Sequence, residues 1–170
     1  MIPRGRVLWS IGGLAVAFLA LQALPYGHDH TNPAGNVEPA WASRQARALV
    51  VRGCFDCHSN FTTWPWYSTV APVSWLIQRD VVGGRQALNF STWNKPQANA
   101  GDVASAVQDG AMPPSYYALL HPRATFSPAE LTALIRALAT LSGPTGDQAR
   151  PPLGAAVRVA TPGGATPSGR

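Results

Sequence analysis

The feature that most constrains this 170-residue chain is the motif Cys54-Phe55-Asp56-Cys57-His58, which contains its only two cysteines. In a C-x-x-C-H pattern, two thiols can add to the vinyl groups of one haem while the next histidine binds its iron. The short spacing follows from covalent geometry, because both thioethers must reach neighbouring edges of one porphyrin. The motif therefore predicts a single covalent haem c bound through Cys54, Cys57 and His58.

Three other uses of these cysteines are open. A Cys-x-x-Cys redox pair normally opens a helix in a fold of alternating strands and helices, and no such pattern flanks the motif. A zinc site would need His58 and His121 as further ligands, which is an ill-spaced set. A disulfide across two intervening residues would be strained and would close almost no loop. Haem is favoured over all three.

The sixth iron ligand decides between electron transfer and ligand binding. Met112 follows His58 by 54 residues, in Gly110-Ala111-Met112-Pro113-Pro114, and is the only methionine besides Met1. Its thioether suits the iron of an electron carrier, and the adjacent prolines would hold the sulfur in place. We expect Met112 to be this ligand, with His121 or an open distal site as the alternatives.

Further cofactor contacts are expected from aromatic and basic side chains. An apolar wall around a large flat cofactor is predicted from Trp64, Trp66, Tyr67, Trp75, Phe90 and Trp93, and we assign Trp75 to the cofactor site. A partly buried haem propionate needs a cation or a hydrogen-bond donor. Arg85 is the preferred candidate for that role, with Arg79 as the second.

The first 24 residues have the pattern of a membrane anchor. Arg4 and Arg6 precede an uncharged stretch of 18 residues from Val7 to Leu24. A cleaved signal peptide is the alternative, but it usually has a shorter apolar core and small residues at the cleavage site. By the positive-inside rule, we expect a single-pass protein of the bacterial inner membrane whose haem domain faces the periplasm.

The rest of the chain divides by composition. Residues 25–40 lack periodicity and predict a flexible linker, in which His28 and His30 are assigned no role. Residues 41–142 predict the haem domain, and residues 143–170, rich in Pro and Gly, predict a disordered tail.

Helical periodicity predicts the secondary structure of the domain. Helices are expected at 41–51, ended by Gly53, at 73–82 and at 100–108. Ser127-Pro128-Ala129-Glu130 predicts a capping box that begins a further helix. No strand pattern is visible, so we expect an all-α, small cytochrome c-like domain with long loops.

The charge pattern bears on partners. The formal charge of +5 is thinly spread, and Lys95 is the only lysine. Nucleic-acid binding needs clustered basic residues, so the sequence argues against it. An acidic protein or an anionic lipid is a better match.

Several motifs together resemble the family known as the haem-binding domain, a group of bacterial c-type cytochrome-like proteins with one haem motif. The resemblance spans 41–141 and rests on these pieces: Cys54-Phe55-Asp56-Cys57-His58-Ser59-Asn60, Thr63-Trp64-Pro65-Trp66-Tyr67-Ser68, Ala71-Pro72-Val73-Ser74-Trp75, Asp80-Val81, Gly84-Arg85, Leu88-Asn89-Phe90-Ser91, Gly110-Ala111-Met112-Pro113-Pro114-Ser115-Tyr116 and Leu120-His121-Pro122. It implies a covalent haem in an exported or membrane-tethered domain and no particular reaction. The order of helix, haem motif, methionine loop and capped helix is also similar to a class I cytochrome c, which implies His58 as proximal and Met112 as distal ligand.

These observations favour a membrane-tethered monohaem c-type cytochrome that passes single electrons between periplasmic or membrane-bound redox partners. It would be an electron carrier rather than an enzyme. Two alternatives are a peroxidase-like haem enzyme or gas sensor, with Tyr116, Tyr117 or His121 beside an open distal site, and an accessory haem subunit of a respiratory or photosynthetic complex.

Overall fold

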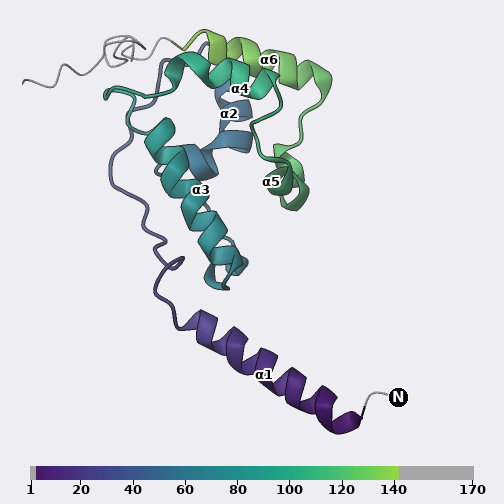
Figure 1. Ribbon diagram of the computed structural model, residues 1–170. Coiled ribbons are helices and arrows are strands. Elements are labelled where there is room, and N and C mark those ends of the chain that lie inside the picture. Colours follow the sequence, from purple (N-terminus) through teal and green to yellow (C-terminus); the bar gives the residue numbers. More distant parts are fainter. Residues whose placement is uncertain (1–2, 142–170) are drawn as a thin grey trace, which may run out of the picture.

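The computed structural model describes residues 3–141, and within them the chain forms α-helices and no β-strand (Figure 1). The predicted all-α class is confirmed. The helices are α1 (Arg4–Gln22), α2 (Arg44–His58), α3 (Val73–Ala87), α4 (Val103–Gln108), α5 (Ser115–Leu120) and α6 (Pro128–Ala139), with 3-10 turns η1 (Trp66–Thr69), η2 (Ala100–Asp102) and η3 (Pro122–Ala124). The predicted tail, residues 143–170, lies outside the described residues.

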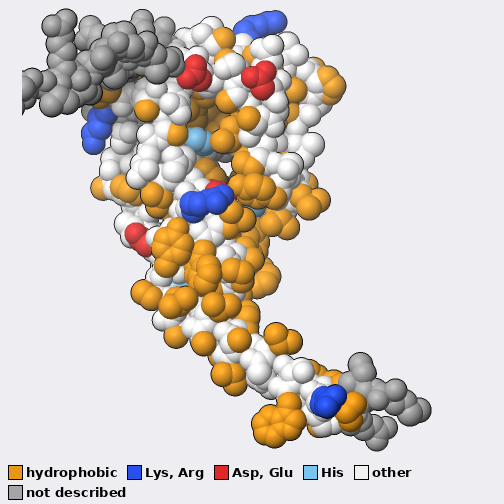
Figure 2. Space-filling model, viewed as in Figure 1, with side chains coloured by type: hydrophobic (Ala, Val, Ile, Leu, Met, Phe, Trp, Pro, Cys, Tyr) orange, Lys and Arg blue, Asp and Glu red, His pale blue; other side chains and the backbone are white. Residues whose placement is uncertain are grey.

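Helix α1 projects away from the other helices, which gather into one domain (Figure 1). Its Gly5–Gln22 window has a mean hydropathy of 1.4, and none of it is buried. Figure 2 shows hydrophobic side chains along this helix and on the adjoining part of the domain. An apolar helix of this length at the N-terminus is long enough to cross a membrane, and a signal sequence has the same character.

Helix α2 carries the Cys-x-x-Cys-His motif in its last turns. It begins with a cap, because the Ser43 side chain accepts a hydrogen bond from the Ala46 amide at 3.0 Å. The expectation that Gly53 ends this helix is wrong, since the helix continues to His58. Gly53 serves close packing instead: a Cβ there would lie 2.6 Å from the Phe126 ring.

The core of the domain lies where α2, α4 and α6 meet. Its buried members are Leu49, Val50, Phe55, Leu88, Phe90, Trp93, Val107, Leu134, Leu138 and Leu141. The rings of Phe55 and Trp93 both stack on Phe90, with centroids 5.7 Å away in each case. Helix α6 begins with the predicted capping box, in which Ser127 and Glu130 bond reciprocally. This core fixes the end of α2 against the rest of the domain.

The segment between α1 and α2 is not the free spacer that its composition suggests. His30 stacks on Trp64, with ring centroids 4.5 Å apart, and its Nε2 hydrogen-bonds the Ser68 carbonyl. Val37 donates to the Ser91 carbonyl and accepts from the Trp93 amide. The segment lacks helix because of its Pro and Gly content, yet partners far away in sequence hold it on the domain surface.

Candidate functional site

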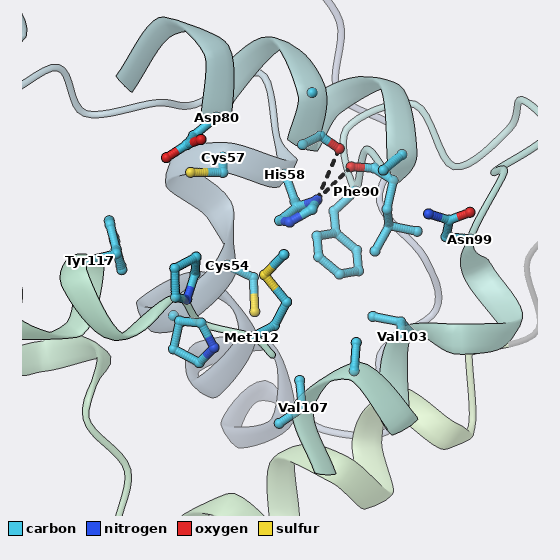
Figure 3. A pocket seen from close by; sticks show the side chains of 18 of the residues that line it. Cys54, Cys57, His58, Asp80, Phe90, Asn99, Val103, Val107, Met112 and Tyr117 are labelled. Atoms are coloured by element: carbon cyan, nitrogen blue, oxygen red, sulfur yellow. Dashed lines mark hydrogen bonds between the residues drawn. The ribbon is translucent and has the colours of Figure 1, made fainter. Parts of the chain in front are cut away.

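A cavity of about 440 Å³ lies between α2, α3, α4 and the loop before α5 (Figure 3). Its wall is mostly apolar. It includes Cys54, Cys57, His58, Arg79, Asp80, Gly83, Gly84, Leu88, Phe90, Asn99, Val103, Val107, Met112, Pro113, Pro114, Tyr116 and Tyr117. The structure therefore brings the two cysteines, His58 and Met112 to one cavity, as the sequence predicts.

Cys54 and Cys57 are one helical turn apart, so both thiols lie on the cavity side of α2 (Figure 3). They are not joined in a disulfide. Burial raises the pKa of each thiol to about 12, with the neighbouring Cys57 adding to the effect at Cys54 and Asp80 adding to it at Cys57. These groups are therefore held as neutral thiols, whereas redox-active and zinc-binding cysteines depend on the thiolate.

His58 is oriented by the end of α3. Its Nδ1 lies 3.0 Å from the carbonyl oxygens of both Gly84 and Leu88. Carbonyl oxygens only accept, so Nδ1 carries the hydrogen and Nε2 keeps a lone pair. Burial lowers the pKa of His58, against a smaller opposing effect of the two carbonyls, which favours the neutral ring. A second-shell bond of this kind is what orients a histidine that ligates a metal.

Gly84 allows the two helices to approach closely enough for that arrangement. A Cβ at this position would lie 2.5 Å from the Cys57 carbonyl oxygen and 3.1 Å from the Cys57 Cβ. Any larger residue would push α3 away from the motif and would move the carbonyl that holds His58. The Gly83-Gly84 pair was read from the sequence only as a helix breaker.

Met112 extends into the cavity toward the ring of His58 (Figure 3). Its loop is set by Gly110, which has a φ of +72°, and by a hydrogen bond from the Met112 amide to the Ala106 carbonyl at 3.0 Å. Pro113 and Pro114 line the same wall. The side chain therefore comes from a loop fixed to α4 on one side and to α5 on the other.

Arg85 does not line the cavity. Its guanidinium donates to the Ser59 and Thr31 carbonyls, at 2.8 and 2.9 Å, and to the side chains of Asn32 and Thr62, both at 2.8 Å. These bonds join the linker to the end of the haem motif, so its donors are taken up by the protein. Of the two arginines considered from the sequence, Arg79 is the one at the cavity.

The aromatic prediction is met by one residue. Phe90 lines the cavity, whereas Trp75 packs against the linker, where a Cβ on Gly27 would lie 2.5 Å from its Cδ1 atom. Trp64 stacks on His30, Trp93 belongs to the core and Trp66 is largely exposed. Aliphatic residues on α4, Val103 and Val107, take the expected place of the tryptophans.

His121 lies in a second, smaller cavity of about 70 Å³. Its Nε2 is 3.1 Å from the Tyr67 hydroxyl and its Nδ1 is 3.0 Å from the Tyr117 carbonyl, while its ring stacks on that of Tyr117 at 4.0 Å. Both ring nitrogens therefore have protein partners. The structure does not bring His121 to the large cavity with His58.

Two acid–tyrosine pairs separate the cavities. Tyr117 donates to Asp56 and Tyr116 donates to Asp80, both at 2.7 Å. Burial raises the pKa of Tyr117, and its hydrogen bond to Asp56 adds to the effect. Sequence reasoning named these tyrosines only for an open distal site and missed the two acids, although Asp56 is inside the motif.

The donors around the large cavity suit a haem. Two neutral thiols, a histidine with a free Nε2 lone pair and a thioether face one apolar space. Within residues 3–141, no group of three or more His, Cys, Asp and Glu side chains could hold a bare metal ion.

Comparison with known proteins agrees with this chemistry. No curated protein and no solved structure matches the chain. A family model described as "Haem-binding domain" matches residues 16–140, which includes the linker, the motif and α6. By this match over most of its length, the chain belongs to the haem-binding domain family.

Proposed function

We propose that this haem protein is a membrane-anchored monohaem c-type cytochrome that carries single electrons between periplasmic or membrane-bound redox partners. The observation that carries the proposal is the convergence of Cys54, Cys57, His58 and Met112 on one apolar cavity. When bound there, haem supplies an iron that accepts and releases one electron.

The cysteines would make the attachment covalent. Each thiol would add across one vinyl group, its sulfur bonding to the inner carbon and its hydrogen going to the outer one, so that no oxidant is required. The raised thiol pKa values and the cavity-facing positions of Cys54 and Cys57 support this use. A haem attached in this way would stay with the denatured polypeptide.

His58 and Met112 would bind the iron from the two sides of the haem. For His58, support comes from the hydrogen on Nδ1 and the lone pair on Nε2. For Met112, it comes from a loop that directs the thioether into the same cavity. With both positions taken by protein, the iron would exchange electrons and have no site for a substrate.

We also propose that α1, with residues 1–24, anchors the chain in the bacterial inner membrane. Arg6 and Arg4 would stay in the cytoplasm under the positive-inside rule, so the haem domain would face the periplasm. Its redox partners would then be proteins of the membrane or the periplasm.

Optical spectroscopy of the purified full-length protein tests the sixth ligand. A c-type spectrum that is unchanged by carbon monoxide, with a sulfur-to-iron charge-transfer band, is expected for the wild type. Met112→Ala should lose that band and bind carbon monoxide, while His121→Ala should keep the wild-type spectrum. Ready binding of carbon monoxide by the wild type would contradict the carrier proposal and favour the enzyme or sensor, in which Tyr116 and Tyr117 line the open side.

A further inference from the structure

The junction between α1 and the domain has no slack. Gln22, the last residue of α1, accepts a hydrogen bond from the Ala71 amide at 2.9 Å and donates one to the Ala71 carbonyl at 3.1 Å. Ala71 is buried between η1 and α3. Five residues later, Gly27 is buried against Ser74 and Trp75, with a φ of +92°. Wherever the end of α1 lies, the surface around Ala71 lies beside it.

Large apolar side chains are exposed on that surface. Trp66 in η1 is 79% exposed, and α5 exposes Leu119 at 81% and Leu120 at 60%. They are linked across the surface, because Val73, Leu76 and Leu120 line one small cavity and Tyr67, which lines it too, packs edge-on against Trp66. We call the set Trp66, Val73, Leu76, Leu119 and Leu120 the apolar face.

The apolar face lies on the side of the domain toward α1. Figure 1 shows α5 and the N-terminal end of α3 as the parts of the domain nearest to that helix. Figure 2 shows hydrophobic side chains continuing from α1 onto the domain. The face contains no charged residue, so it has no electrostatic cost of approach to an apolar phase.

We infer that the apolar face rests in the interfacial layer of the lipid bilayer that α1 enters. This inference depends on the anchor proposed above. A protein partner on this face would have to fit between the domain and the bilayer, and the direct bonding of Gln22 to Ala71 leaves no linker to make that space. An amphipathic ring such as that of Trp66 favours the headgroup level, and leucines reach the acyl boundary below it.

Photo-crosslinking of the full-length chain in vesicles of phosphatidylethanolamine and phosphatidylglycerol tests the occupant. Benzoylphenylalanine replaces Trp66 in one variant and Leu119 in a second, so that a folding defect at one site does not decide the result. The matched control replaces Val51, an exposed apolar residue of α2 outside the face. The expected result is a phospholipid adduct, detected by mass spectrometry, at positions 66 and 119 and its loss at position 51.

Two measurements on the same samples separate the inference from its premises. Resistance to alkaline carbonate extraction reports the anchor, and the haem spectrum reports a loaded domain. A chain that washes off overturns the inference together with its anchor. A loaded chain that stays in the membrane but gives no lipid adduct at 66 or 119, or gives covalent dimers there, overturns the inference alone.

Discussion

The two cavities of the domain each contain a histidine, and the two histidines are held in different ways. At His58, two backbone carbonyls fix Nδ1 and leave Nε2 for the larger cavity. At His121, the Tyr67 hydroxyl and the Tyr117 carbonyl engage both nitrogens. The comparison shows that a histidine becomes a ligand when one nitrogen is fixed and the other is free, whereas two protein partners make it a structural residue.

Exchange of the two histidines for alanine gives the largest expected difference. His58→Ala removes the only histidine of the large cavity, and we expect almost no haem to remain on the chain after denaturing electrophoresis. His121→Ala should keep wild-type haem staining and lose only some stability. Equal haem loss in both variants would contradict the distinction.

Gly84→Ala tests how His58 is held. The new Cβ would meet the Cys57 carbonyl and push α3 from α2, at a cost of about 1–3 kcal/mol in the free energy of unfolding. We expect a lower yield of haem-loaded protein as well, measured as the ratio of haem to polypeptide absorbance. Gly101→Ala is the control, because nothing lies within 4 Å of a Cβ there. A normal yield from Gly84→Ala would show that the helices can separate without releasing His58.

Tyr117→Phe tests the wall between the cavities. It removes the buried hydrogen bond to Asp56, for which we expect a loss of about 1–3 kcal/mol in chemical denaturation. Because Tyr117 fixes α5 behind the Met112 loop, carbon monoxide should also displace Met112 more readily. Tyr116→Phe breaks a more exposed bond to Asp80 and should have the smaller effect on both measurements. The reverse order would contradict this role of Tyr117.

Glu38 lies outside both cavities and gives the smallest expected effect. Hydrogen bonds, first from Arg47 and then from Trp41, lower its pKa to about 2 against the cost of burial. The unfolded chain takes up the proton at a higher pH than the folded one, so this contribution is complete above about pH 4.5. It is lost as the pH falls from there toward 2.

Glu38→Gln should therefore destabilise the protein by about 1 kcal/mol at neutral pH and flatten the stability curve below pH 4.5. Thermal unfolding as a function of pH measures both effects. Arg47→Gln should flatten the curve in the same interval. Parallel curves for wild type and Glu38→Gln would assign the acid sensitivity to other groups, including those of the cavities.

Local sequence patterns were sufficient for some parts of this molecule. The cap at Ser127, the apolar run of α1 and the convergence of Met112 with the motif follow from short-range rules. The position of Arg85 and the docked linker do not. Their partners lie up to 54 residues away in sequence, so neither periodicity nor turn chemistry contains them.

Two errors have a common physical cause. Gly53 was expected to end a helix, and Gly84 was read only as a break, because glycine weakens helices in isolation. In the fold, each glycine lies within a helix at a contact too close for a Cβ, with Phe126 in one case and with the backbone of Cys57 in the other. Tertiary packing of this kind outweighs intrinsic propensity.

The bonding of Gln22 to Ala71 also determines how this protein would meet other molecules under the proposed function. A domain joined to its anchor in this way turns and drifts with it as one body, instead of sampling a volume above the bilayer. Encounters with a membrane-bound partner would then arise from lateral diffusion in two dimensions. Their frequency would scale with the number of molecules per unit of membrane area, and electron flow would follow the crowding of that membrane.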